Sequence, residues 1–523
     1  MASKFPQKKS VVFAQDKSFY TFSEFESRSN QMANFFTEIG IKKGMRTLLF
    51  VTPRLDFSIL TFALFKVGAI PVLIDPGMGI KNLLHSIKQV KPDALVSIGK
   101  VHWLRRILKD AFQSVSIKVS LDKVGGKTHY LYEKLSQYPK TFSIVNLENS
   151  DPSAILFTSG GTGVPKGVVY THGIMNAQTD ALKQMFSLDE TQTDLPGFPL
   201  FALFTLAMGM TSVIPDMDPT KPASCDPSKI VRNIIHHQAT FLAGSPAIWE
   251  RVGEYCLRHN IQLACVKHLV MFGAPVRMDI HRMFKKILPF GETFTPYGAT
   301  ECLPVTLISG SEVLNSRSEQ GFGTCVGRAV PGVKIRIMTI SDIPESTIVE
   351  KKSGEKGEII VSGTQVTRLY FDMPDETFRA KIIDENGVLW HRMGDLGYLD
   401  HNNRLWFLGR KTHRVESPSE TFFPLEVEAP FNHHPLVKRV ALINLNSGDK
   451  KRPGLVIERH DGETKVDMDF IRELRSLAIK DGPSSKVHDF YLHPGFPVDV
   501  RHNIKVDQQR LGLWAQTKKG IHV

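Results

Sequence analysis

The chain has 523 residues, of which 42% are apolar, 23% charged and 9% aromatic, an ordinary globular composition that excludes a disordered chain and suggests two to four domains. Lys and Arg number 65 against 53 Asp and Glu, a net charge of +12, which favours an anionic partner such as a nucleotide, an acyl carboxylate or an anionic membrane surface, or else is a basic solvated surface without a partner. No compact Lys/Arg run with interleaved aromatic residues occurs, so nucleic acid is not an expected partner.

Neither the cysteines nor the apolar stretches point to a secreted or membrane-spanning protein. The five cysteines are an odd number, widely spaced, with no Cys-x-x-Cys pair, which disfavours a disulfide framework or a zinc site and is typical of a reducing compartment. The first residues lack the apolar core of a secretory signal, so we expect a cytoplasmic protein. The longest apolar stretch, residues 196–214, is interrupted by Pro and Gly; we expect it to form a wall of an apolar pocket.

Strand and helix patterns alternate along the first half of the chain. The capping box Thr21-Phe-Ser-Glu24 starts a predicted helix. Strands are expected at 47–51, 70–74 and 94–98, with helices at 57–67, 81–90, 177–185, 229–236 and 247–258. This alternation predicts an α/β fold in which helices cover both faces of a mostly parallel sheet.

The pattern changes after residue 333. Alternating apolar residues at 333–337 and 358–361 predict antiparallel strands that close the large domain, with a loop or hairpin at 341–356 between them. The strongly polar segment 411–420 predicts a hinge. We therefore expect a large domain over residues 1–411 and a small, mobile α+β domain over residues 412–523.

A glycine-rich turn after the apolar strand 154–157 carries the sharpest chemical signal. Glycines let backbone N–H groups approach phosphate oxygens, and hydroxyls and a lysine add donors and positive charge. The turn is not a Walker A loop, because Pro precedes its lysine and Gly follows it. The candidate phosphate-binding residues are Thr158, Ser159, Gly160, Gly161, Thr162, Gly163 and Lys166.

Two further segments are weaker signals when taken alone. Tyr297-Gly298-Ala-Thr300-Glu301 presents an aromatic ring, a hydroxyl and a carboxylate, which could stack a base, bind phosphate and hold Mg²⁺, although a capped helix start would look the same. Asp395 and Arg410 could bind the hydroxyls and oxygens of one ribose; an ordinary turn Asp and surface Arg are the alternative.

Together these segments resemble the adenylate-forming superfamily of acyl-CoA synthetases, luciferases and peptide-synthetase adenylation domains. The resemblance covers nearly the whole chain, and the matching motifs occur in the family's order. They are residues 65–76, the phosphate loop 158–167, Gly273-Ala274-Pro275, residues 297–301, residues 357–363 through Tyr370, residues 391–397 and Gly409-Arg410.

The resemblance implies a reaction and roles for the motif residues. A carboxylate attacks the α-phosphate of ATP to give an acyl-adenylate and pyrophosphate. Lys166 and Thr300 would neutralise phosphate charge, Glu301 would hold Mg²⁺, and Asp395 with Arg410 would bind ribose. Tyr297 and the Gly273-Ala274-Pro275 turn would border adenine. The small domain would add a catalytic lysine, Lys505, with Arg501 as the rival, because the usual Pro-Lys-Thr-x-x-Gly-Lys pattern is replaced by Pro-Val-Asp-Val-Arg-His-Asn-Ile-Lys.

Departures from the general family pattern point to a subgroup. In acyl-CoA synthetases a hinge glycine lets pantetheine pass, and Ser419 stands at that position here, while Thr412 replaces the hinge acid. The segments around 201–204, 210–219 and 498–505 resemble the OleC-type β-lactone synthetases of bacterial olefin biosynthesis. The resemblance implies that a long-chain 3-hydroxy acid is adenylated and that its own hydroxyl then displaces AMP.

Two other functions remain open at this stage. A long-chain fatty acid–CoA ligase is the alternative enzyme, and a catalytically silent nucleotide-binding scaffold is the alternative of another class. The partners expected besides ATP, Mg²⁺ and the acid are a weakly bound membrane surface or another enzyme of the olefin pathway.

Overall fold

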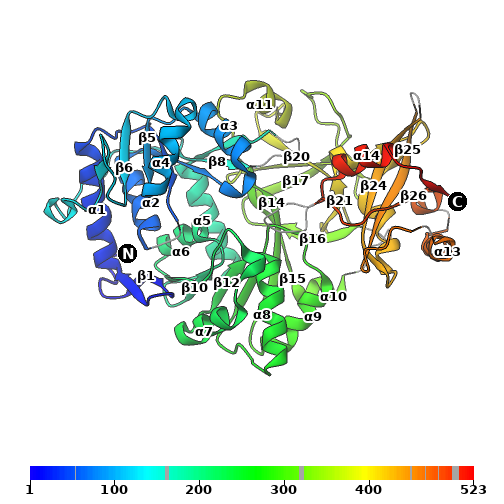
Figure 1. The fold of residues 1–523 in the computed structure, drawn as a ribbon, viewed down its shortest axis with the longest axis horizontal. Coiled ribbons are helices and arrows are strands. Elements are labelled where there is room, and N and C mark those ends of the chain that lie inside the picture. Colours follow the sequence, from blue (N-terminus) through cyan, green and yellow to red (C-terminus); the bar gives the residue numbers. More distant parts are fainter. Residues whose placement is uncertain are drawn as a thin grey trace.

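The computed structural model describes residues 1–52, 55–158, 164–316, 323–447, 450–465, 467–480, 482–497 and 506–523. Figure 1 shows the chain running from an N-terminal α/β layer (blue and cyan), through a second sheet (green and yellow), to a smaller unit (orange and red) at the other end. The α/β class expected from the sequence is confirmed. Among the described residues, no helix has the length and apolar content needed to cross a membrane.

The first sheet has the predicted parallel core. Its order is β7(His129–Tyr130), β6(Ile117–Ser120), β5(Ala94–Ser97), β3(Arg46–Phe50), β4(Ile70–Ile74), β8(Pro152–Thr158) and β9(Lys166–Thr171). All neighbours are parallel except β8 and β9. Helices on this part of the chain are α1(Phe22–Glu38), α2(Leu55–Val67), α3(Ile80–Val90), α4(Gly99–Ile107) and α5(His172–Phe186).

Local sequence signals account for how these helices begin. Thr21 caps α1 in a complete capping box with Glu24, as the sequence predicts. Thr171 caps α5, which begins earlier than the expected residue 177. The apolar faces of α1 and α2 pack into one core around Met32, Phe36 and Leu60, all fully buried.

The second sheet is mixed. Five strands, β11(Thr211–Ile214), β10(Thr193–Pro196), β12(Phe241–Gly244), β13(His268–Met271) and β14(Glu292–Ala299), pair in parallel, and β1(Lys9–Phe13) is parallel to β11. β2(Ser18–Thr21) pairs with β1 in antiparallel fashion. Helices of this region are α6(Ala202–Ala207), α7(Pro227–His237), α8(Pro246–Arg258), α9(Met278–Ile287) and α10(Gly310–Asn315).

Beyond β14 the same sheet becomes antiparallel. Its further members are β15(Cys302–Ser309), β16(Thr324–Ala329), β21(Leu405–Arg410), β20(Leu389–Leu399), β18(Gly357–Gly363) and β17(Val333–Met338), and β19(Lys381–Ile383) pairs with β20. The expected antiparallel pair after residue 333 is β17 and β18. α11(Pro374–Ala380) precedes β19. The sheet therefore joins the β14–β15 turn to β20 and β21.

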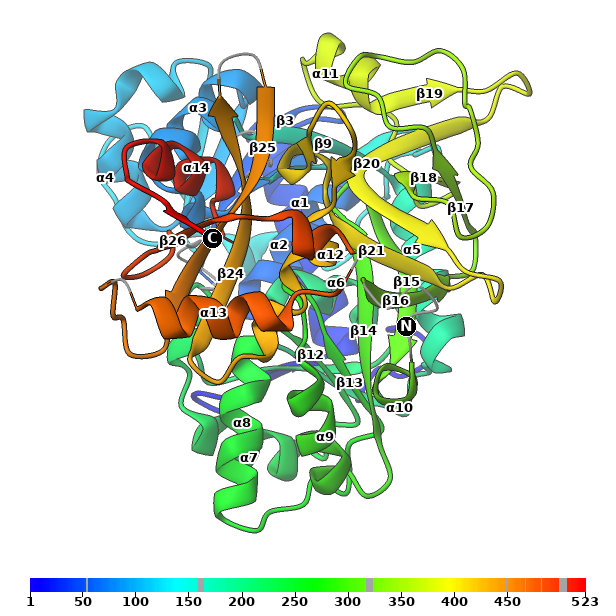
Figure 2. The ribbon, with the colours of Figure 1, turned by 90° about the vertical axis from the view of Figure 1, so that its right-hand side faces the viewer.

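The C-terminal unit has its own sheet and core. β24(Val437–Ser447), β25(Lys450–Arg459), β26(Asp489–Leu492) and β27(Ile521–His522) form the sheet, with α12(Pro424–Glu428), α13(Met468–Leu477) and α14(Gln508–Gln516) beside it. Its core includes Phe431, Leu455, Ile471 and Phe490, all fully buried. In Figure 2 this unit lies in front of the large sheets. A hairpin of β22(Val415–Glu416) and β23(Thr421–Phe422) follows β21.

Candidate active site

Three side chains from three strands meet at the centre of the second sheet. The hydroxyl of Tyr297 on β14 donates to Asp395 Oδ2 at 2.6 Å, and Arg410 reaches Asp395 Oδ1 at 2.8 Å. Burial raises the pKa of Asp395, although Arg410 opposes that rise. Asp395 in turn raises the pKa of Arg410. The result is a buried carboxylate whose orientation is fixed from two sides.

The turn between β14 and β15 presents Thr300 and Glu301. Tyr170 on β9 donates its hydroxyl to the Thr300 carbonyl oxygen at 2.6 Å, and Tyr370 donates to Glu301 Oε1 at 2.7 Å. Lys381 is buried beside this turn and donates to the Thr367 carbonyl oxygen. Burial lowers the pKa of Lys381 to about 8, against the attraction of Glu301. The turn is thus held rigidly by tyrosine hydroxyls from outside its own hairpin.

The two ends of the glycine-rich turn are antiparallel partners. Thr158 pairs with Lys166, whereas Ser159, Gly160, Gly161, Thr162 and Gly163 lie outside the described residues. The Lys166 ammonium pairs with Glu376 Oε2 at 2.5 Å and lies 5.1 Å from the ring centre of Tyr370. Tyr370 therefore contacts both Lys166 and Glu301, and it places the lysine next to the Glu301 turn.

Gly273, Ala274 and Pro275 follow β13 at the same sheet edge as Tyr297. Val270 and Phe294 are register partners on the neighbouring strands β13 and β14. Gly273 and Tyr297 each lie three residues beyond that pair, in the same direction. Gly273 has a φ of 92°, a left-handed conformation that favours glycine. Gly298 lies against the Cys302 carbonyl oxygen, which an added Cβ would approach to 2.7 Å.

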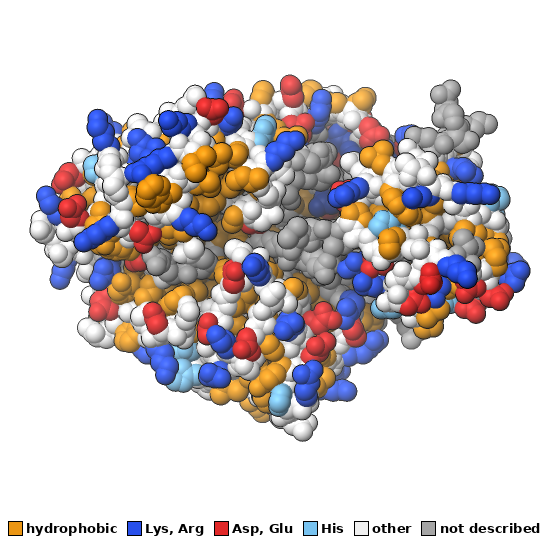
Figure 3. Space-filling view, in the orientation of Figure 1, with side chains coloured by type: hydrophobic (Ala, Val, Ile, Leu, Met, Phe, Trp, Pro, Cys, Tyr) orange, Lys and Arg blue, Asp and Glu red, His pale blue; other side chains and the backbone are white. Residues whose placement is uncertain are grey.

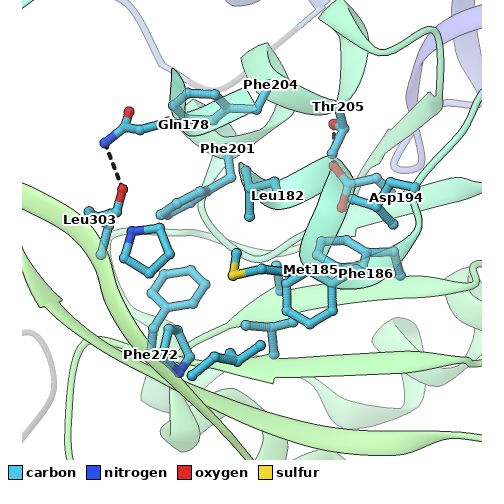
Figure 4. Close-up of a pocket in the computed structure, with 17 residues that line it drawn as sticks. Gln178, Leu182, Met185, Phe186, Asp194, Phe201, Phe204, Thr205, Phe272 and Leu303 are labelled. Carbon is cyan, nitrogen blue, oxygen red and sulfur yellow. Dashed lines mark hydrogen bonds between the residues drawn. The ribbon is translucent and has the colours of Figure 1, made fainter. Parts of the chain in front are cut away.

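An apolar pocket opens beside this edge, between α5, α6 and the strands β12 to β15. Its lining is almost entirely aromatic and aliphatic, including Phe201 and Phe204 from the segment expected to form a pocket wall. Figure 4 shows two polar exceptions on opposite sides, Gln178 next to Leu303, and Asp194 next to Thr205. Gln178 donates to the Leu303 carbonyl oxygen at 2.8 Å. The pocket therefore offers an apolar surface to a bound group.

The segment after β21 is folded rather than extended. Lys411 donates to the Ser341 carbonyl oxygen at 2.8 Å and pairs with Glu358 at 3.0 Å, and the buried Glu358 also pairs with Arg392 at 2.6 Å. Thr412 is exposed in the short 3₁₀ turn Lys411–His413. The predicted polar hinge therefore contains an anchored lysine.

Three further residues named from the sequence belong to the predicted small domain, and the structure describes one of them, Ser419. Lys505 and Arg501 lie outside the described residues. Ser419 is exposed between β22 and β23, with its hydroxyl 3.2 Å from that of Ser417.

Several residues around the site were missed by the sequence analysis. Tyr370 ended a matched motif but was given no role, and Glu376 and Lys381 lie beyond that motif, so nothing marked them. Asp194 had a visible signal: it is an acidic residue at the start of the apolar run Leu195–Ala207, where a strand pattern predicts burial.

The chain resembles known proteins over almost its whole length. Residues 1–371 match the profile of the AMP-binding enzyme family. The olefin beta-lactone synthetases of Xanthomonas campestris pv. campestris and Stenotrophomonas maltophilia are each 38% identical to it, over 95% of this chain and 91% of theirs. The acyl-CoA ligase SID4 of Ajellomyces capsulatus is 24% identical, over 92% of this chain and 84% of its own.

Solved structures share the fold at lower identity. The ATP-bound MatB of Rhodopseudomonas palustris has a TM-score of 0.80 at 20% identity, over 98% of this chain and 96% of its own. The amide bond synthetase McbA of Marinactinospora thermotolerans has a TM-score of 0.81 at 20% identity, over 97% of both chains.

Proposed function

Because this chain belongs to the AMP-binding enzyme family, we propose that it activates a long-chain 3-hydroxy acid with ATP and closes the acyl-adenylate to a β-lactone. The carboxylate attacks the α-phosphate and releases pyrophosphate. The 3-hydroxyl oxygen then bonds to the acyl carbon, the bond from that carbon to AMP breaks, and the hydroxyl proton is lost.

The observation that carries this proposal is the similarity to the two olefin beta-lactone synthetases. The sequence identity to these two proteins is 38% over 95% of the chain, whereas the identity to the acyl-CoA ligase SID4 is 24%. The apolar pocket beside the Tyr297–Asp395–Arg410 cluster supports an acid with a long alkyl chain.

The proposed nucleotide contacts follow from the chemistry of the cluster. Asp395, paired with Arg410, would accept hydrogen bonds from ribose hydroxyls. Tyr297 and the Gly273-Ala274-Pro275 turn would border adenine. Lys166, the Thr158 hydroxyl of the phosphate loop and the Thr300 hydroxyl of the 297–301 turn would bind the phosphates, and Lys166 must exchange its contact with Glu376 for them.

The residues present fit Mg²⁺ bound together with a nucleotide. In the described part of the chain, no three His, Cys, Asp or Glu side chains gather as a metal cage would require. Mg²⁺ commonly binds through one or two carboxylates plus substrate phosphates, and Glu301 supplies such a carboxylate. When bound, the ion would neutralise phosphate charge, while Tyr370 holds Glu301 in place.

We propose that the small domain begins at residue 412 and rotates about Arg410–Lys411 between the two half-reactions. In the described conformation Lys411 pairs with Glu358, so rotation would break this contact. Lys505 would reach the reacting phosphate from the small domain. Ring closure needs no entry path for a second substrate, because the nucleophile is already on the adenylate.

The test is product analysis by mass spectrometry with ATP, Mg²⁺ and a long-chain 3-hydroxy acid. We expect AMP, pyrophosphate and a product that is lighter than the acid by one water. CoA should change neither rate nor product, and the matching acid without a 3-hydroxyl should stall as bound adenylate. If turnover instead depends on CoA and an acyl-CoA accumulates, the protein is an acyl-CoA ligase and not a β-lactone synthetase.

We also propose that the enzyme works in the cytoplasm and touches an anionic membrane surface through α4. The side chains of Trp103 and Ile107 are 62% and 79% exposed. Basic residues surround them, and the Arg106 guanidinium lies 4.7 Å from a Trp103 ring centre. Figure 3 shows hydrophobic side chains bordered by Lys and Arg on the part of this face that carries α3 and α4. Such a patch suits headgroup phosphates and interfacial insertion.

Vesicle sedimentation tests this surface. The protein should bind phosphatidylglycerol vesicles more strongly than phosphatidylcholine vesicles, and Trp103→Ser with Ile107→Ser should weaken binding to the phosphatidylglycerol vesicles. Ile343→Ser, at a residue 66% exposed elsewhere, is the control. Unchanged binding by the double variant would contradict this surface and favour another partner, such as an enzyme of the same pathway.

A further inference from the structure

The apolar pocket has a near end and a far end that can be located from the strand register. Asp194 pairs with Phe241, Phe241 with His268, and His268 with Glu292. These four residues form one row across the sheet. Pro296 lines the pocket four residues beyond that row, which corresponds to about 13 Å along a parallel strand.

The helix that covers the pocket gives the same length. Gln178 binds Leu303 at the near end, close to the Thr300 turn. Phe186 meets Phe241 edge to face at the far end, with ring centres 5.3 Å apart. Eight residues of α-helix separate Gln178 from Phe186, about 12 Å. Asp194 therefore lies at the floor of the pocket, a dozen ångströms from the adenylate end.

Asp194 is fully buried, and only one of its two oxygens is used. Thr205 and Ser212 both donate to Oδ2, at 2.7 and 3.3 Å. Among the described residues, no donor or acceptor reaches Oδ1. Figure 4 shows the carboxyl group directed toward the interior of the lining residues. A buried oxygen without a partner is costly, and such an atom in a pocket indicates a ligand group or a water that completes it.

We propose that Asp194 forms a polar floor of the acyl pocket and sets the length of the alkyl chain that the enzyme accepts. This inference rests on the proposed function, since it assumes that the pocket holds the acyl chain. Oδ1 is sealed from solvent, so a shorter chain must leave space at the floor into which the lining can shift to admit a water. A chain whose methyl group reaches the floor displaces that water and leaves Oδ1 unpaired.

The pocket length converts into a chain length. Because a C–C bond of about 1.5 Å advances an extended chain by about 1.25 Å, the methyl group should meet the floor after about ten carbons. Burial also raises the pKa of Asp194 to about 7, so the carboxyl group can be neutral or charged near pH 7. In either form it remains polar toward an incoming methyl group.

The experiment compares two acids whose chains are equally long and reach the pocket floor. One chain ends in a methyl group and the other in a hydroxyl. Both carry the same 3-hydroxy acid group and the same number of non-hydrogen atoms. The readouts are displacement of a fluorescent fatty acid, which reports binding alone, and pyrophosphate release. We expect the wild-type protein to bind the hydroxyl-ended acid at least tenfold more tightly, and to show no such preference when both chains stop two carbons short.

Two variants of Asp194 distinguish the effect of its polarity from the effect of its size and shape. Asp194→Val should reverse the preference, whereas Asp194→Asn, which retains a polar group and an acceptor for Thr205 and Ser212, should keep it. Asp189→Asn, at an exposed acid on the preceding turn, is the control. Equal binding of both acids by the wild-type protein, or an unchanged preference in Asp194→Val, would overturn the proposal.

If Asp194→Val does not fold, the wild-type comparison and Asp194→Asn still decide the question. The proposed function fails separately: in that case neither acid would release pyrophosphate, whatever the binding measurements show.

Discussion

Arg410 lies directly opposite Asp395 in the antiparallel pair of β20 and β21, and its guanidinium approaches the carboxylate to 2.8 Å. This pairing joins the last strand before the proposed small domain to the proposed ribose site. The hydroxyl of Tyr297 completes the cluster from β14. A nucleotide bound here would therefore contact the strand that leads directly into the hinge.

The first prediction concerns this cluster. Tyr297→Phe removes one donor to Asp395 while keeping the ring, so we expect KM for ATP to rise about tenfold, the size of one hydrogen bond to a charged group. Asp395→Asn should raise it much more, because the ribose acceptor loses its charge. ATP–pyrophosphate exchange measures both. Equal effects of the two variants would show that Tyr297 contacts the nucleotide more strongly than it orients Asp395.

The second prediction concerns the small-domain lysine. Lys505→Ala should lower acyl-adenylate formation by orders of magnitude, because a positive charge is lost from the developing transition state. Nucleotide binding should survive, since the ribose and adenine contacts belong to the large domain. Hydroxylamine trapping of the adenylate reports the rate. Arg501→Ala is the matched variant, and normal trapping by Lys505→Ala with loss in Arg501→Ala would transfer the role to Arg501.

The third prediction concerns the hinge. Thr412→Pro fixes a backbone dihedral in the 3₁₀ turn after β21, which should hinder rotation of the small domain. Adenylate should still form if the proline holds the small domain in the adenylate-forming orientation, but turnover should fall several-fold. Thr412→Ala, which leaves the backbone free, should behave like the wild type. Wild-type turnover of the proline variant would mean that lactone closure needs no rotation.

The fourth prediction concerns the contact between Lys166 and Glu376. If Lys166 binds phosphate, Glu376 competes with ATP for it, and it also adds negative charge near pyrophosphate. Glu376→Gln should therefore lower KM for ATP by a few-fold, as measured by initial rates. Glu385→Gln, at an exposed acid after β19, is the control. A raised KM would instead indicate that Glu376 positions Lys166 for the substrate.

The fifth prediction concerns pH. Burial raises the pKa of Asp194 from 3.8 to about 7, so between about pH 4 and pH 7 the folded protein holds a proton that the unfolded chain has lost. The free energy of unfolding should therefore fall as the pH rises through this window. Asp194→Asn should flatten the pH dependence of the thermal midpoint, and Asp189→Asn should not. A steeper dependence in Asp194→Asn would contradict the assigned environment.

Local patterns were enough to predict individual helices and strands. The Thr21–Glu24 capping box is present as expected, and the strand predicted at 70–74 is β4. The motifs named residues 273–275 and 297–301, but their meeting at one sheet edge follows from the register of β13 and β14. The polar segment after β21 was expected to be a hinge, yet Lys411 is anchored on Glu358 there, a long-range contact that no local pattern records.

The sequence by itself determined the α/β class and named the candidate residues of the phosphate turn and the nucleotide motifs, because these depend on periodicity and on residue types at short spacing. Only the tertiary structure decided that Asp395 is held by both Arg410 and Tyr297, that Lys166 is paired with Glu376, and that Asp194 lines an apolar pocket. Each of these relationships joins strands or helices far apart in the chain. The charge and hydrogen-bonding state of a side chain depends on what the fold buries beside it.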